Sequence, residues 1–249
     1  MLEHRINLID GARPRRLRPY RIPDKLKAEV SRQIKDLQEQ GKIRPSNSPF
    51  AHPVVCVTKP SGDVRLCVDL RLVNSMTIAD RYPLPRVDDL LRRVSNAKWI
   101  TKIDASQGFH QIPIVPEDCF KTAFVTDDGQ FEFVYLPFGA KTASQTYERM
   151  MDILLAPHRE YACAYIDDAP IYSEGWDAHL GHLRKVFTSV REAEVTLKLS
   201  KCEFAQSQIT FLGFRVGSGT RTAIESKVAA IQRIAEPNSR KSAFIFRCC

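Results

Sequence analysis

Two adjacent carboxylates, Asp167 and Asp168, interrupt an otherwise apolar stretch that runs from residue 161 to residue 173. Burying such charges without partners is strongly unfavourable, so the pair needs an explanation. One interpretation is a hairpin turn that exposes both acids to water. The other is a divalent-cation site, because carboxylate oxygens are natural ligands of Mg2+.

A third acid, Asp104, follows the apolar run WITKI and would stand at the end of a strand. If that strand and the 161–173 stretch meet at one sheet edge, Asp104, Asp167 and Asp168 converge and could hold two Mg2+ ions. Two such ions stabilise the attacking and leaving oxygens of a phosphoryl transfer. Aspartates at strand ends are common, however, so the pattern alone leaves surface carboxylates as the alternative.

Other residue patterns indicate no competing chemistry. His179 and His182 lie three residues apart, but no third metal ligand is suggested nearby, so a surface helix is expected. The seven cysteines show no metal-binding spacing and are predicted to be reduced thiols, mostly buried. The sequence contains neither a G-x-x-x-x-G-K-[ST] phosphate loop nor a G-x-S-x-G motif.

The composition is that of a globular protein, with 249 residues, 43% hydrophobic residues and mean hydropathy of -0.27. No apolar run approaches the roughly 20 residues of a spanning helix, and the first residues lack a secretory signal, so we expect an intracellular, cytoplasmic protein. The net charge of +8 favours an anionic partner, with nucleic acid ahead of an anionic membrane.

The elements that must position these acids follow from periodicity. Helices are expected from Asp24, as the cap, to Gly41, over 144–155 and over 176–193, and the proline-punctuated stretch 81–94 is expected to lead into a short helix. Hairpins are expected over 54–70 and around Asp128-Gly129, and shorter strands within 98–114 and 196–217. Residues 1–23 form an extended arm rich in arginine. Helices and hairpins without a βαβ rhythm predict the α+β class.

Five ordered sequence blocks carry a resemblance to a known family. They are YIDD at 165–168, KID-x4-FHQI around Asp104, LPFG at 136–139, RLCVDLRLVN at 65–74 and FLGF at 211–214. From about Tyr20 to Gly219 the chain resembles the reverse transcriptase domain of a gypsy-type LTR retrotransposon Pol polyprotein. The resemblance implies a right-hand polymerase fold, with fingers and an antiparallel palm sheet backed by helices.

The resemblance also implies an activity. The chain would be an RNA-directed DNA polymerase, a nucleotidyltransferase that adds dNTPs to a primer 3′-hydroxyl on an RNA or DNA template. Asp104, Asp167 and Asp168, with the carbonyl of Ala105, would hold two Mg2+ ions, or Mn2+ in their place. RNase H and integrase segments of the same element are expected partners, retrotransposon particles are an expected location, and no membrane partner is expected.

Further roles come from the same resemblance. Lys59, Arg65, Gln107, Gly108, Phe109 and Phe138 would bind the nucleotide, with Phe109 excluding a ribose 2′-hydroxyl. Primer and template would be contacted by Arg71, Asn74, Gly139, Leu212 and Gly213. The implied domains are a basic extended arm (1–23), mainly fingers (24–95), mainly palm with a fingers segment, the YIDD hairpin and the primer-grip hairpin (96–219), and a truncated connection toward the thumb (220–249).

Three departures from the family pattern keep a second hypothesis open. Ala169-Pro170 replace two aliphatic residues after YIDD, and Pro170 removes a strand donor beside the acids. Residues 140–144, AKTAS, differ from the usual helix start. The pattern ends soon after Pro237, with no RNase H, integrase or protease segment expected. The alternative is therefore a degenerate, catalytically weak fragment that keeps the fold and binds nucleic acid.

Overall fold

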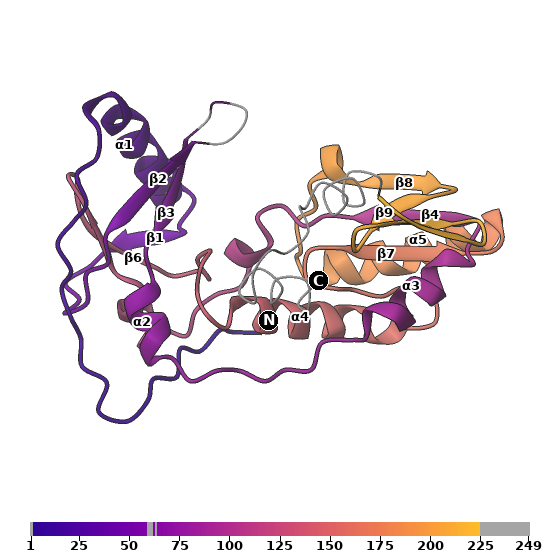
Figure 1. Ribbon diagram of the computed structural model, residues 1–249, viewed down its shortest axis with the longest axis horizontal. Helices are drawn as coiled ribbons and strands as arrows, with labels where there is room; N and C mark the ends of the chain where they lie inside the picture. The colour runs from indigo at the N-terminus through magenta and orange to yellow at the C-terminus, as the bar shows by residue number, and fades with distance from the viewer. Residues whose placement is uncertain (1, 59–61, 63, 225–249) are drawn as a thin grey trace, which may run out of the picture.

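The computed structural model describes residues 2–58, 62 and 64–224. Figure 1 shows them as two units, one at the left that contains α1 (Asp24–Glu39) and one at the right that contains α4 (Ala143–Leu155) and α5 (Trp176–Glu192). Every sheet in this described part pairs its named strands antiparallel. Helices and antiparallel sheets confirm the predicted α+β class.

The first unit is built on two small sheets. One has the order β1-β6-β5, and the other is the hairpin β2-β3. The bounds are β1 Ile43–Pro45, β5 Phe124–Thr126, β6 Gly129–Phe133, β2 Val54–Thr58 and β3 Val64–Val68. Val30 and Ile34 of α1 are buried in one core with Phe124 and Phe131, since apolar residues four apart share a helix face. The short helix α2 (Arg71–Met76) follows β3.

The second unit centres on β4 (Trp99–Ile103), which lies between β7 (Ala169–Ser173) and β8 (Glu203–Gln206). α4 and α5 supply Met150, Leu154, Val186 and other residues to the core beneath this sheet. A three-stranded sheet, in the order β11-β10-β9, and α3 complete the unit. Their bounds are α3 Val87–Ser95, β9 Ile209–Phe211, β10 Phe214–Gly217 and β11 Thr220–Ala223. The predicted helices and the 54–70 hairpin are therefore confirmed.

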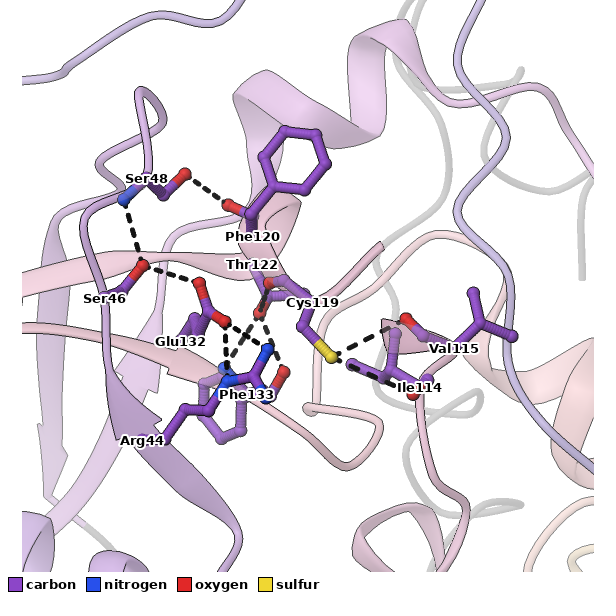
Figure 2. A network of polar contacts seen from close by, with 10 residues as sticks. All are labelled: Arg44, Ser46, Ser48, Ile114, Val115, Cys119, Phe120, Thr122, Glu132 and Phe133. Atoms are coloured by element: carbon purple, nitrogen blue, oxygen red, sulfur yellow. Dashed lines mark hydrogen bonds and ion pairs between the residues drawn. The ribbon is translucent and has the colours of Figure 1, made fainter. Parts of the chain in front are cut away.

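A buried polar network in the first unit joins β1 to β6 (Figure 2). Glu132 accepts hydrogen bonds from Arg44 Nε at 2.8 Å and from Ser46 Oγ at 2.6 Å. Nearby, Ser48 Oγ donates to the carbonyl of Phe120 at 2.6 Å. Because the carboxylate of Glu132 has a guanidinium and a hydroxyl as partners, its burial is tolerated. This network stabilises the scaffold.

The basic arm is extended, as predicted, but its first part is packed on the protein. Ile6 is buried, its N–H donates to Asp118 Oδ2 at 2.6 Å, and its carbonyl accepts from Lys121 Nζ at 2.8 Å. His4 Nδ1 and Thr146 Oγ1 of α4 share a hydrogen bond of 2.8 Å. The first part of the arm, which includes His4 and Ile6, therefore contacts both units, and we call it the N-terminal strap.

Several local predictions were wrong. Asp24 is the first residue of α1 and not its cap, because Pro23 precedes it in an extended conformation. The second strand expected within 98–114 is replaced by a 3₁₀ helix, Gly108–Gln111, followed by isolated bridges at Pro113 and Ile114. The β5–β6 turn lies at residues 127–128, since Thr126 pairs with Gly129.

Two helix faces also differ from expectation. His179 is fully buried, and the predicted surface position is wrong because the hydroxyls of Thr101 and Ser173 are hydrogen-bonded to its two ring nitrogens at 2.8 and 3.0 Å. The helical spacing of Met150, Ile153 and Leu154 predicts one shared apolar face of α4, but Ile153 is 62% exposed whereas the other two are buried. Leu199–Lys201 forms a 3₁₀ helix where a strand was expected.

Some boundaries can be compared with the expected domains. Helix α3 falls inside the 24–95 segment, yet it packs against β10 of the second unit. The connection expected over 220–249 lies outside the described residues beyond Ile224, and so does the departure after Pro237. Within the described residues, none of the helices combines the length and the hydropathy that crossing a bilayer requires.

Candidate active site

A cleft of about 770 Å³ lies between the two units. α1 and β3 form its wall on the first unit, and the segment after β4 forms much of its wall on the second. Eight of the residues predicted from the sequence line it: Arg65, Asp104, Ala105, Gln107, Gly108, Phe109, Phe138 and Asp167. Within the described residues, the structure therefore brings five of the predicted nucleotide-binding residues and two of the three acids to one place.

Asp104 enters the cleft because β4 ends immediately before it. Its carbonyl accepts a hydrogen bond from the N–H of Lys198 at 2.9 Å, and its Oδ2 lies 3.4 Å from Lys201 Nζ. The next N–H in this direction, that of Ser106, donates to Thr196. Since successive residues of an extended segment alternate in direction, the carbonyl of Ala105 points away from the 196–198 segment.

Asp167 lies in a tight turn closed by the pair of hydrogen bonds between Tyr165 and Asp168, at 2.9 and 3.2 Å. Ile166, the residue before it, has φ of 51°, which is unfavourable for a β-branched residue. Partial burial and the nearby charge of Asp104 raise the pKa of Asp167, while Lys201 opposes the rise. The carboxylates of Asp104 and Asp167 are therefore close enough to repel each other.

Asp168 occupies a different position from the other two acids. Its Oδ1 lies 4.0 Å from Lys102 Nζ, which also pairs with Glu203 Oε1 at 2.6 Å. Burial raises the pKa of Asp168, Lys102 lowers it, and the charges of Asp167 and Asp104 raise it further. Asp168 is thus near the other acids electrostatically, but its carboxylate approaches Lys102 of β4 and is not part of the cleft lining.

Pro170 leaves the central sheet in register. β7 pairs with β4 without interruption from Ala169, opposite Ile103, to Ser173, opposite Trp99. The carbonyl of Pro170 accepts from the N–H of Cys163 at 3.2 Å, so its ring nitrogen faces the 161–165 segment and not β4. The missing donor therefore removes one hydrogen bond from the outer hairpin and none from the β4–β7 ladder.

The donor set fits a divalent cation that keeps further ligands for a substrate. Among the described side chains, no group of three His, Cys, Asp or Glu residues converges tightly enough to hold a metal by itself. Mg2+ is typically held by one or two carboxylates together with substrate phosphates and water, rather than by a complete protein cage. The carboxylates of Asp104 and Asp167, together with the backbone carbonyl of Ala105, match that requirement.

The floor of the cleft is aromatic. The Phe109 ring lies 5.2 Å from that of Phe138 and 5.5 Å from that of Tyr147, in an edge-to-face contact. Arg65 extends from β3 toward the same floor, with its guanidinium carbon 6.0 Å from the centre of the Phe138 ring. Gln107, just before Gly108, has φ of 49°, another left-handed conformation at the cleft. Lys59 lies outside the described residues.

Comparison with known proteins agrees with this geometry. A family model described as "Reverse transcriptase (RNA-dependent DNA polymerase)" matches residues 57–216. The retrovirus-related Pol polyprotein from transposon opus of Drosophila melanogaster is 40% identical over 228 residues, which is 89% of this chain and 23% of that polyprotein. The chain belongs to the reverse transcriptase family.

Further relatives confirm the gypsy-type resemblance. The Pol polyprotein from transposon gypsy of D. melanogaster is 35% identical over 216 residues, 84% of this chain and 21% of that one. The chain thus spans less than a quarter of these curated relatives. Foamy viral protease-reverse transcriptase structures in complex with dsDNA or an RNA/DNA hybrid superpose with TM-scores of 0.84 and 0.83 at 28% identity, covering 97% of this chain and 50% and 32% of theirs.

Following the expected domains, we call the first unit the fingers and the second unit the palm. Sequence reasoning missed several residues of the cleft between them, among them Tyr147, Lys198 and Lys201. Tyr147 is 2% exposed, and burial together with the charges of Asp167 and Asp104 raises its pKa. The two lysines, three residues apart in LKLSK, were a visible signal, whereas Tyr147 looked like an ordinary core residue of α4.

The predicted primer and template residues of this reverse transcriptase lie outside the cleft lining. Leu212 and Gly213 form the tip of the β9–β10 hairpin, both with positive φ. Arg71 forms a two-pronged pair with Asp69, which holds the pKa of Asp69 at about 2, while its guanidinium stays largely exposed. Asn74 binds backbone atoms of Gly139 and Lys141, at the end of the LPFG segment.

The contacts of Asn74 explain how that loop is held. Its amide nitrogen donates to the carbonyl of Gly139 at 2.7 Å, and its amide oxygen accepts from the N–H of Lys141 at 2.9 Å. Gly139 has φ of 89°, a conformation that glycine adopts without strain. Asn74 and Gly139 therefore fix the loop that carries Phe138, a role that the sequence did not indicate.

Proposed function

We propose that this chain is the polymerase domain of an RNA-directed DNA polymerase, which adds dNTPs to a primer 3′-hydroxyl on an RNA or DNA template. The observation that carries the proposal is the meeting of Asp104 and Asp167 in a cleft whose opposite wall holds Arg65. Membership of the reverse transcriptase family supports the same activity.

Asp104 and Asp167, with the carbonyl of Ala105, are the proposed ligands of the divalent cations, Mg2+ or Mn2+, on which this family generally depends. Two bound cations would lower the pKa of the primer hydroxyl and neutralise charge on the triphosphate. Asp168 is the third proposed acidic ligand, and Lys102 partly balances its charge. Burial, and after it the charges of neighbouring carboxylates, raise the pKa values of Asp167 and Asp168, which fits carboxylates that a cation would stabilise in their charged form.

The remaining residues of the cleft would bind the nucleotide. Arg65, joined by Lys59, is proposed to hold the phosphates, because a guanidinium donates several hydrogen bonds to phosphate oxygens. The backbone at Gln107 and Gly108 would contribute N–H groups, and Phe109 would support the sugar and exclude a 2′-hydroxyl. Phe138, which is 47% exposed, would form the adjoining wall.

Primer and template would follow the surface outside this cleft. The β9–β10 tip at Leu212 and Gly213 is the proposed primer contact, and Arg71 the proposed template contact. Asn74 and Gly139 act on template binding through the loop that they fix. Foamy viral reverse transcriptases in complex with dsDNA and an RNA/DNA hybrid share this fold, which supports a duplex as the partner. RNase H and integrase segments of the same element remain proposed partners.

A primer-extension assay tests the activity. Purified protein is given poly(rA)/oligo(dT), dTTP and Mg2+, and the wild type is compared with Asp167→Asn. Asp127→Asn is the matched control, because it removes an exposed carboxylate from the β5–β6 turn of the fingers. We expect extension by the wild type and by the control variant, and a loss of about 10²-fold or more in Asp167→Asn. Equal, background-level extension by all three would leave only a nucleic-acid-binding fragment.

A further inference from the structure

A fully buried glutamate, Glu148, contacts the turn between Tyr165 and Asp168 from the side of α4. It follows Tyr147 on α4 and is 0% exposed. Its Oε2 accepts a hydrogen bond from the N–H of Ile166 at 2.5 Å. Its Oε1 has no hydrogen-bond partner among the described residues, and no described Lys or Arg forms an ion pair with Glu148. Burying a carboxyl group with one unpartnered oxygen costs free energy of folding, and packing alone does not account for its presence here.

The residue that Glu148 contacts is the strained one in the turn. Ile166 has φ of 51°, and this left-handed conformation is unfavourable because its side chain is β-branched. Such conformations persist when the surroundings hold them, and they concentrate at functional sites. The N–H of Ile166 is directed inward to α4, whereas the next side chain, that of Asp167, lines the cleft.

We propose that Glu148 is a positioning residue for Asp167: its side-chain oxygen fixes the Ile166 N–H and so maintains the left-handed turn that presents Asp167 to the cleft. This role rests on the proposed polymerase function, since it acts through a proposed ligand of the cations. Tyr147, the preceding residue, contacts Phe109, so one turn of α4 supports both the acid and the nucleotide floor.

The chemistry of the contact requires an acceptor and not a charge. Burial raises the pKa of Glu148, which favours the neutral carboxylic acid inside the palm. A neutral carboxylic acid accepts the hydrogen bond through its carbonyl oxygen, and the amide of glutamine offers the same oxygen at the same reach. Glu148→Gln should therefore preserve the turn, whereas Glu148→Met, with similar volume and no such acceptor, should release it.

Single-nucleotide primer extension measures the consequence, with kcat, KM for dTTP and the Mg2+ concentration for half-maximal rate determined for each variant. We expect Glu148→Gln to stay close to the wild type. Glu148→Met should lose about tenfold in kcat, the effect of one lost buried hydrogen bond, with a raised Mg2+ requirement and little change in KM. Loss in Glu148→Gln equal to that in Glu148→Met, or none in either, would overturn the proposal.

Thr146→Val is the matched control on the same helix. It removes the buried hydrogen bonds that the Thr146 hydroxyl makes with His4 and with the carbonyl of Thr142, without touching the turn. It should lower the melting temperature and leave kcat and the Mg2+ requirement unchanged. If it reduces kcat as much as Glu148→Met does, the effect of Glu148 is merely one of stability. Ile166→Gly provides a second test, because glycine removes the strain, so that Glu148→Met should cost less in that background.

Hydrogen exchange at the Ile166 amide separates this inference from the proposed function. In the full chain without nucleotide, that amide should exchange slowly in the wild type and in Glu148→Gln, and faster in Glu148→Met. This pattern in a protein that extends no primer would contradict the proposed function and retain the held turn. Fast exchange in the wild type would refute the held turn even in an active polymerase.

Discussion

Gly108 allows a direct test of how the aromatic floor of the cleft is packed. A Cβ at this position would lie 2.5 Å from Cε2 of Tyr147 and 2.9 Å from its Cζ and Oη. Tyr147 is 2% exposed and is in edge-to-face contact with Phe109, so its ring has little room to move. Gly108→Ala therefore overpacks a rigid site, which costs about 1–3 kcal/mol. At about 2–4 °C per kcal/mol, the melting temperature should fall by about 2–12 °C.

Gly181→Ala supplies a control of opposite sign. Gly181 lies within α5, and a Cβ there would meet nothing within 4 Å. Replacing a helical glycine by alanine stabilises by about 0.5–1 kcal/mol, so this variant should melt slightly above the wild type. Calorimetry measures both variants, and primer extension measures KM for dTTP, which should rise in Gly108→Ala because a displaced Tyr147 shifts Phe109.

A second substitution locates the cause of the effect. Tyr147→Leu removes the ring that the new Cβ would strike, so adding Gly108→Ala to Tyr147→Leu should cost much less than it does in the wild type. Melting of Gly108→Ala within about 1 °C of the wild type would refute the reasoning, since it would mean that the ring yields freely. An equal cost in both backgrounds would show that the strain arises elsewhere.

Three further outcomes are expected. Phe109→Ala should increase incorporation of rUTP relative to dTTP in primer extension, and an unchanged ratio would exclude the proposed steric role. Arg65→Ala should raise KM for dTTP about tenfold or more with a smaller change in kcat, because it removes a phosphate contact; unchanged KM would place the phosphates elsewhere. Burial lowers the pKa of His110 from 6.5 to about 4, so the unfolded chain binds a proton first as the pH falls. Stability from this group is complete above pH 6.5 and declines toward pH 4, by about 3 kcal/mol at most. Urea titrations of His110→Phe should therefore show a weaker pH dependence than the wild type over that range, and equal slopes would contradict the assignment.

Much of the scaffold followed from local sequence patterns. Helical spacing located α1 and α5, and turn residues between β-branched runs located the β2–β3 hairpin. The pattern also placed Asp104 at the end of β4. These predictions succeeded because the periodicity of apolar residues and the conformational preferences of turn residues act over a few positions. Tertiary contacts do not override these preferences here.

The failures concern contacts between distant segments. The burial of His179 depends on two hydroxyls from other elements, Thr101 and Ser173, which a helical pattern cannot show. The contact of Asp168 with Lys102 joins residues more than sixty positions apart in the chain, which a local pattern cannot show. Tyr147 became a site residue because Gly108 leaves space for its ring, a relation that neither residue reveals alone.

The N-terminal strap couples the unfolding of the two units. His4 is hydrogen-bonded to Thr146 of α4 in the palm. Ile6 is hydrogen-bonded to Asp118 and Lys121 of a 3₁₀ helix, Pro116–Thr122, that packs on β6 of the fingers. Neither unit can unfold while the strap keeps all of these bonds. Fingers and palm should therefore melt in a single cooperative transition, and limited proteolysis within the strap should weaken both at once rather than release one of them as a stable half.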